Sequence, residues 1–140
     1  DMDVELWDGK FEFAFSSPLE GQLGRDIILI DSIGPDELRL VSKGHKLSKE
    51  FLRTYYRNTP WLEAVQKAKQ LAQQRGTKDW KPIVIDELKQ NPLPLNEDYS
   101  LAASALYPCL TNEIAQHLGF KKPFSDLGGL KELHELLNRL

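Results

Sequence analysis

The sequence predicts an α+β protein: a small, mainly antiparallel sheet in the N-terminal third, packed with a helical C-terminal two-thirds. Residues 1–42 combine short β-branched runs with turn residues, and beyond Gly44 the apolar residues recur every three or four positions. The 140 residues are 41% hydrophobic and 28% charged, the composition of an ordinary globular protein. We therefore expect a single domain over residues 1–140, with a sheet-rich part at 1–44 and a helical part at 45–140.

The first expected element is a hairpin that turns at Asp8-Gly9. Glycine adopts the positive φ that a two-residue turn requires, so this dipeptide between apolar residues is a strong hairpin signal. Pairing across the turn places three apolar pairs on one face: Leu6 with Phe11, Val4 with Phe13, and Met2 with Phe15. We expect a loop over residues 17–25, a buried strand at 26–31 and, after a turn at 34–36, another strand at 37–41.

Helices are expected from Lys46 onwards. An amphipathic helix over residues 46–57 would bury Leu47, Phe51 and Tyr55, and Thr59 with Pro60 has the pattern of an N-cap and first helical residue. Further short helices are expected at 100–107, ending before Pro108, at 112–118, and from 125 to the C-terminus. Residues 82–91 fit a strand or a helix equally well.

Positive charge is concentrated in the middle of the chain. Residues 1–42 hold 3 basic and 10 acidic side chains, whereas residues 43–81 hold 10 basic and 3 acidic ones. A row of cations on one helix face suits the regular charge of a phosphate backbone, and a neighbouring tyrosine could stack on a base. The candidate nucleic-acid-binding residues are Lys43, Lys46, Lys49, Arg53, Tyr56 and Arg57. A solvated helix face, or packing of the basic helices over the acidic sheet, explains the same pattern.

A second pattern also suggests DNA binding. Residues 111–120, TNEIAQHLGF, contain the I-A-x-x-L-G spacing that resembles the first helix and turn of helix-turn-helix domains. The resemblance covers about ten residues, and the following KKPFSDLGG does not continue it as a recognition helix. It therefore supports DNA binding without assigning the chain to that family.

Two alternative functions depend on other residues. Asp36, Glu87 and Lys89 have the residue types of a restriction-type nuclease, in which two carboxylates hold a divalent metal and a lysine assists the attacking water. A protein–protein adaptor would use the acidic sheet or the C-terminal leucine-rich segment, where Leu133 and Leu137 form either core or an exposed docking strip.

The remaining residues indicate where the protein works rather than what it does. Cys109 is the single cysteine, which excludes an internal disulfide and favours a reducing cytoplasm. The three histidines lack metal-ligand spacing, no apolar run reaches the length of a membrane span, and the N-terminus does not resemble a secretory signal. The overall prediction is a non-enzymatic, cytoplasmic binding domain with no cofactor and no metal, whose partner is nucleic acid or another anion, with a protein partner or homodimer as alternatives.

Overall fold

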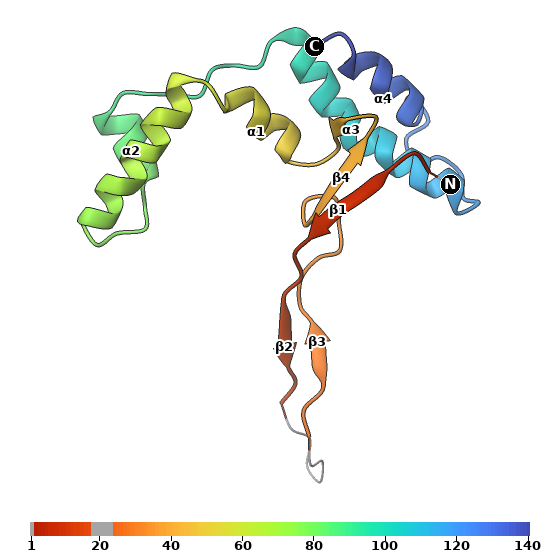
Figure 1. Cartoon of the computed structure of the whole chain (residues 1–140), viewed down its shortest axis with the longest axis horizontal. Coiled ribbons are helices and arrows are strands. Elements are labelled where there is room, and N and C mark those ends of the chain that lie inside the picture. Colours follow the sequence, from red (N-terminus) through yellow and green to blue (C-terminus); the bar gives the residue numbers. More distant parts are fainter. Residues whose placement is uncertain (1, 18–23) are drawn as a thin grey trace.

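The computed structural model describes residues 2–17 and 24–140 (Figure 1). Helices make up 44% of the chain and strands 14%, so the α+β prediction is confirmed. In chain order the elements are β1 (Glu5–Gly9), β2 (Phe13–Phe15), β3 (Ile27–Leu29), β4 (Leu38–Ser42), β5 (His45–Lys46), α1 (Glu50–Tyr56), α2 (Pro60–Gln74), the π-helical turn η1 (Ile83–Glu87), α3 (Glu97–His117) and α4 (Leu130–Leu137).

The larger sheet has three antiparallel strands in the order β1-β4-β5. Leu6 of β1 lies opposite Leu40 of β4, and the register shifts by one residue between Leu6 and Asp8. β4 and β5 are joined by Lys43 and Gly44, whose φ angles of 48° and 82° are both positive. Two consecutive positive φ values are what a two-residue hairpin turn needs, so the chain reverses here instead of starting a helix.

The smaller sheet is a two-stranded hairpin of β2 and β3. Phe13 pairs with Leu29, and Phe15 pairs with Ile27. Figure 1 shows this hairpin projecting from the rest of the molecule, with the larger sheet at its base. The strand predicted at 26–31 is confirmed as β3, but the prediction that it is buried is wrong, because its residues are exposed. Part of the loop predicted at 17–25 lies outside the described residues.

The predicted turn at Asp8-Gly9 is wrong. β1 pairs with β4 and β2 pairs with β3, so the two runs flanking Gly9 never face each other. A Cβ at Gly9 would lie 2.8 Å from Cδ2 of Leu38, so any other residue would require the end of that side chain to shift. Gly9 therefore lies where two strands approach each other closely, and it does not form a turn.

The main apolar core joins the larger sheet to α1, α3 and α4. Leu133 of α4 is fully buried, and the buried residues of this core are Leu40, Leu47, Phe51, Ala102, Ala105, Leu106, Cys109, Leu110, Leu130, Leu133 and Leu137. At one end Asn112 is fully buried, and its amide nitrogen donates to the carbonyls of Phe124, Leu127 and Gly128 at 2.8–2.9 Å. This side chain fixes the loop between α3 and α4.

Several helix boundaries differ from those predicted. α3 is a single helix that continues through Pro108, because buried side chains before and after the proline belong to the same core. Residues 111–117 are the end of that helix and no helix follows until Leu130, so the helix-turn-helix pattern has no second helix. α4 begins after Gly129 rather than at Ser125. α1 begins at Glu50 rather than at Lys46.

α2 and η1 form a second, separate apolar cluster, built from Val65, Ala68, Ala72, Ile83 and Val84. Pro60 begins α2 with Thr59 before it, as predicted. Residues 82–91 fit two structures in sequence; within them Ile83–Glu87 forms a π-helical turn, and Glu87 accepts two hydrogen bonds from Arg75, at 2.6 and 2.8 Å. That residues 1–140 form one domain stays a prediction. None of the helices in the described parts of the chain is long and apolar enough to span a membrane.

Candidate functional site

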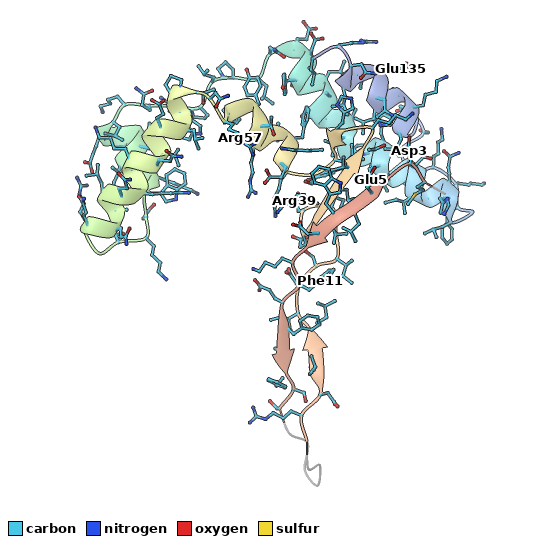
Figure 2. All side chains as sticks on the ribbon, in the orientation of Figure 1. Asp3, Glu5, Phe11, Arg39, Arg57 and Glu135 are labelled. Carbon is cyan, nitrogen blue, oxygen red and sulfur yellow. The ribbon has the colours of Figure 1, made fainter. Side chains whose placement is uncertain are left out.

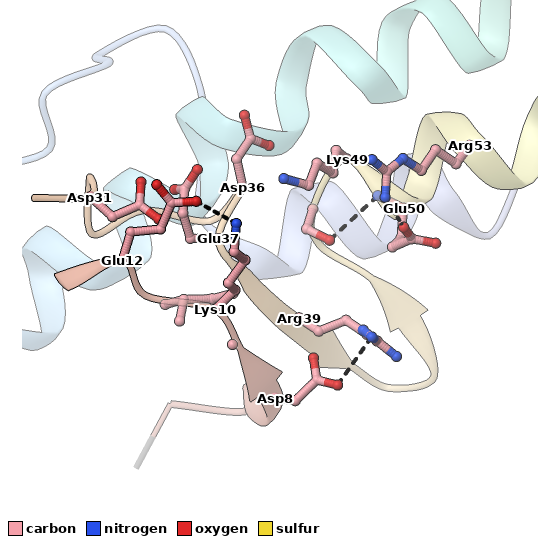
Figure 3. Close-up of a pocket in the computed structure, with 13 residues that line it drawn as sticks. Asp8, Lys10, Glu12, Asp31, Asp36, Glu37, Arg39, Lys49, Glu50 and Arg53 are labelled. Atoms are coloured by element: carbon pink, nitrogen blue, oxygen red, sulfur yellow. Dashed lines mark hydrogen bonds and ion pairs between the residues drawn. The ribbon is translucent and has the colours of Figure 1, made fainter. Parts of the chain in front are cut away.

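A charged cleft of about 580 Å³ lies where the β2–β3 hairpin joins the three-stranded sheet. The segments before and after the hairpin line one side, and the start of α1 lines the other (Figure 3). The lining residues are Asp8, Gly9, Lys10, Glu12, Asp31, Asp36, Glu37, Leu38, Arg39, Ser48, Lys49, Glu50 and Arg53. Because ten of these thirteen carry a formal charge, the cleft is built for a polar, charged ligand.

The backbone places the hairpin residues in the cleft. At the end of β1 the close approach of Gly9 to β4 brings Lys10 beside the turn before that strand, where its amide donates to the carbonyl of Glu37 at 3.0 Å. The next bond, from the amide of Ile30 to the carbonyl of Glu12 at 3.0 Å, starts the hairpin ladder. Glu12 and Asp31 are thereby held at the base of the hairpin, facing the cleft (Figure 3).

Three of the four cations in the cleft are already paired. Lys10 contacts Glu12, Arg39 contacts Asp8 at 3.0 Å, and Arg53 contacts Glu50. The hydrogen bond between Lys10 and Glu12 is the largest cause of a raised pKa for the lysine and a lowered pKa for the glutamate, so both stay charged at neutral pH.

Asp36 is held in place by the helical core. The Tyr107 hydroxyl, on α3, donates a hydrogen bond to Asp36 Oδ1. Burial, followed by this bond, raises the pKa of Tyr107 above its ordinary value, so the tyrosine keeps its proton and remains a donor. The contact fixes one acidic side chain of the cleft to the core.

Lys49, Asp31 and Glu37 remain available for a ligand. In the described parts of the chain, none of the three makes an ion pair. A cation on the α1 side suits a phosphate or carboxylate, and carboxylates on the hairpin side suit amino and hydroxyl groups. Among residues 2–17 and 24–140, no group of three or more His, Cys, Asp or Glu side chains is placed to hold a metal ion.

The predicted nucleic-acid-binding stripe is divided among several elements. Lys43 lies in the β4–β5 turn and contacts Asp3 at 3.4 Å, while Lys46 lies on β5. Lys49 precedes α1, and Arg53 lies on it beside the same cleft. The stripe fails as a single helix face because residues 45–49 form a strand and a bend instead of a first helical turn.

Tyr56 and Arg57 lie farther along, towards α2. The Tyr56 hydroxyl donates to the carbonyl of Leu93 at 2.9 Å, and Arg57 contacts Glu50 at 3.6 Å. Both residues line a second, more apolar cleft of about 590 Å³ between α1 and α2. The Tyr56 hydroxyl therefore holds the loop before α3, so the ring is not free to stack on a base.

The residues predicted for a nuclease lie apart in the fold, and the leucines predicted for an adaptor are buried. Asp36 lies in the cleft, whereas Glu87 pairs with Arg75 in the α2–η1 cluster, so the two carboxylates have different partners in different parts of the fold. Lys89 follows η1 with a positive φ of 52°. Leu133 and Leu137 are 0% and 3% exposed, so they fill the core and form no docking strip.

The geometry thus defines a charged cleft, and comparisons with known proteins give two matches. Residues 1–69 match the family described as SAICAR synthetase. The chain is also 32% identical over 117 residues to the "Putative phosphoribosylaminoimidazole-succinocarboxamide synthase" of Archaeoglobus fulgidus, a match covering 83% of this chain and 30% of the relative. The chain therefore corresponds to less than a third of that relative's length. No solved structure matches the chain.

These similarities overturn the predicted function. Both are to enzymes, so the predictions of a non-enzymatic nucleic-acid-binding domain, a protein adaptor and a metal-dependent nuclease are wrong. Sequence reasoning singled out Asp36, Lys49 and Arg53 for other roles and missed Lys10, Glu12, Asp31 and Arg39. The sequence signal that could have identified these residues is the pair of opposite charges, Lys10 and Glu12, just before the apolar strand β2.

Proposed function

We propose that this chain forms the substrate-binding part of a carboxamide-forming ligase of the SAICAR synthetase type. The supporting observation is that every residue lining the charged cleft, from Asp8 to Arg53, falls within the 69 residues that match this family. The cleft therefore lies wholly within the part of the chain that is similar to this family. The proposed place of work is the cytoplasm, whose reducing conditions suit the free, buried Cys109.

The name of the relative defines the reaction class. A succinocarboxamide is an amide whose nitrogen carries a succinyl unit, so it corresponds to a carboxylate joined to the amine of aspartate. A carboxylate does not form an amide spontaneously in water, and transfer of a phosphoryl group to it creates a leaving group. The proposed substrates are ATP, an aminoimidazole ribotide carrying the carboxylate, and aspartate.

The α1 side of the cleft would hold the anionic part of a substrate. Lys49 extends from the start of α1 towards the cleft (Figure 3), and among the cleft's four cations it is the one that makes no ion pair within the described chain. Arg53 adds a second positive charge one turn along the helix. In phosphoryl transfer the protein acts mainly by positioning groups and compensating their charge, and Lys49, with Arg53 nearby, supplies positive charge for this.

The hairpin side would hold the groups that donate hydrogen bonds. The carboxylates of Asp31 and Glu37 accept hydrogen bonds from an ammonium or from ribose hydroxyls. In the coupling step the amine forms the new C–N bond as the bond from the acyl carbon to phosphate breaks, and the amine must first lose a proton. A carboxylate beside the ammonium holds it in place and is a suitable acceptor for that proton.

Binding of the reaction product tests the proposal, because the phosphoribosylaminoimidazole-succinocarboxamide carries both the ribotide and the succinyl carboxylates. We expect the chain to bind it in isothermal titration calorimetry. Replacing Lys49 by Ala should weaken binding about tenfold or more, the loss expected for one charge-assisted contact.

The matched control is Lys78→Ala. Lys78 is exposed and lies in neither cleft, so this change removes the same charge from the chain without touching the site. Its affinity should equal that of the unchanged protein. If Lys49→Ala and Lys78→Ala have the same effect on product binding, the cleft is not the substrate site.

A further inference from the structure

The second cleft, between α1 and α2, combines an aromatic lining with positive charge. Two of the three tryptophans of the chain, Trp61 and Trp80, line it together with the apolar side chains of Leu52, Leu62 and Val65. Its volume is about 590 Å³. A cleft with a mainly apolar and aromatic lining and a few charged groups has the composition of a small-molecule binding site.

Both tryptophans are held by the α2–η1 cluster. Trp61 is the second residue of α2, and Trp80 precedes η1, where its carbonyl accepts a hydrogen bond from the amide of Val84 at 3.1 Å. Each indole is half-buried and packs against the buried residues of that cluster. The two hydrogen bonds between Arg75 and Glu87 also join α2 to η1. The aromatic surface is therefore fixed before a ligand arrives, which reduces the entropic cost of binding.

Three cations and one carboxylate line the same cleft. Arg53 and Arg57 both contact the carboxylate of Glu50, and Figure 2 shows Arg57 at the end of α1 that is nearer α2. Lys69 of α2 makes no ion pair with any residue that the structure describes, and its ammonium lies 5.4 Å from the centre of the Trp80 ring. The cleft therefore has an excess of positive charge next to its aromatic surface, which favours an anion.

The aromatic surface and the charge together define the class of ligand. An indole stacks on other flat aromatic rings, and a two-ring base covers more of it than a single ring does. Lysine and arginine bind phosphate through charge-assisted hydrogen bonds. We propose that the second cleft binds a purine nucleoside monophosphate, with the base on the indoles of Trp61 and Trp80 and the phosphate at Lys69 and Arg57. The proposed reaction product has a single imidazole ring, so it is a poorer ligand for this cleft.

The nucleotide site is separate from the substrate cleft. Asp31, Glu37 and Lys49, the groups available for a ligand in the substrate cleft, do not line the second one. Only Glu50 and Arg53, on α1, line both. A nucleotide bound between α1 and α2 therefore lies beside the substrates rather than among them, and its binding does not depend on the proposed function.

Tryptophan fluorescence tests this site with adenosine monophosphate as the probe. In a Trp7→Phe background both remaining tryptophans line the second cleft, so the signal reports on that cleft. With excitation at wavelengths that adenine does not absorb, we expect saturable quenching by the nucleotide. Adenosine lacks the phosphate and ribose 5-phosphate lacks the base, so each should bind about tenfold more weakly or less tightly still. Absence of saturable quenching by the nucleotide, or equal binding of either fragment, would overturn the proposal.

Three lysine variants locate the bound nucleotide. Lys69→Ala should weaken its binding about tenfold, because the cation beside the indoles is removed. Lys67→Ala removes the same charge from an exposed position of α2 outside both clefts, and it should leave the affinity unchanged. Lys49→Ala should also leave it unchanged, whereas the same variant is expected to weaken product binding, so the two sites are tested separately. The proposal is overturned if Lys69→Ala binds the nucleotide like Lys67→Ala, or if Lys49→Ala weakens nucleotide binding.

Discussion

The β2–β3 hairpin and the α3–α4 core are both rich in apolar side chains, but these side chains are exposed in the hairpin and buried in the core. Leu133 of α4 is 0% exposed, whereas Phe15 of β2 is 68% exposed. The α4 leucines face α3 and the three-stranded sheet, but residues 2–17 and 24–140 place no second layer on either side of the hairpin. The difference shows that an apolar pattern predicts the local structure of a segment, while burial depends on whether another element is present to cover it.

The sharpest way to test this difference is to truncate one apolar side chain in each region. Leu133→Ala should lower the free energy of unfolding by about 2–5 kcal/mol, because it leaves a cavity in a packed core. Phe15→Ala should change it by less than about 1 kcal/mol, because no packing is lost at an exposed position. Urea denaturation of the two variants measures both values.

Equal destabilisation by the two changes would contradict the comparison. It would show that the hairpin is packed in solution, by a second copy or by a rearrangement of the chain. Running the measurement at two protein concentrations separates these cases, because only self-association makes the midpoint depend on concentration.

The fold class and most of the elements were predictable because they depend on local patterns. Pro60 after Thr59 marked α2, and the β-branched run around Ile28 marked β3. The pairing of β1 with β4 was not predictable from local pattern, because Asp8-Gly9 has the sequence of a turn. Gly9 instead lies close to Leu38 of β4, which is distant in sequence.

The core depends on one polar side chain that no sequence pattern singled out. Asn112→Ala should lower the free energy of unfolding by about 2–3 kcal/mol, since the carbonyls of Phe124, Leu127 and Gly128 lose their donor and the amide of Phe124 loses its acceptor. Asn91 is exposed in a loop, so Asn91→Ala is the control and should be neutral. A neutral Asn112→Ala in thermal or urea unfolding would mean that the α3–α4 loop is held by other contacts.

The candidate site was less predictable than the fold for the same physical reason. Lys10, Glu12 and Asp31 are separated from Lys49 in sequence, and only the crossing of β1 and β4 brings their segments to one cleft. The basic run at 43–57 holds five Lys and Arg residues. Its interpretation as one helix face failed because Lys43 and Gly44 adopt positive φ values and turn the chain into β5.

The smallest expected effect concerns His134, which joins the core to the three-stranded sheet through Ser42 at 3.0 Å. Burial lowers the pKa of His134 below 6.5; the charges of Lys43 and His45 lower it further, and those of Asp3 and Glu113 oppose the shift. The unfolded chain therefore takes up this proton at a higher pH than the folded one. The contribution is fully present above pH 6.5 and is lost as the pH falls towards the folded pKa.

Between pH 7 and pH 5 we expect the free energy of unfolding to fall by about 1 kcal/mol or less on account of this group. His134→Gln should remove that part of the pH dependence, and His117→Gln, at an exposed position, should keep it. An identical pH profile for both variants would show that His134 is not the responsible group.

We propose that the cleft at the base of the hairpin binds the substrates of a carboxamide-forming ligase. A backbone amide NMR titration of the chain with phosphoribosylaminoimidazole-succinocarboxamide tests this directly. We expect saturable shifts at residues 8–12, 31–39 and 48–53, with little change at residues 61–80 around the second cleft. No shifts at millimolar product, or shifts confined to residues 61–80, would contradict it.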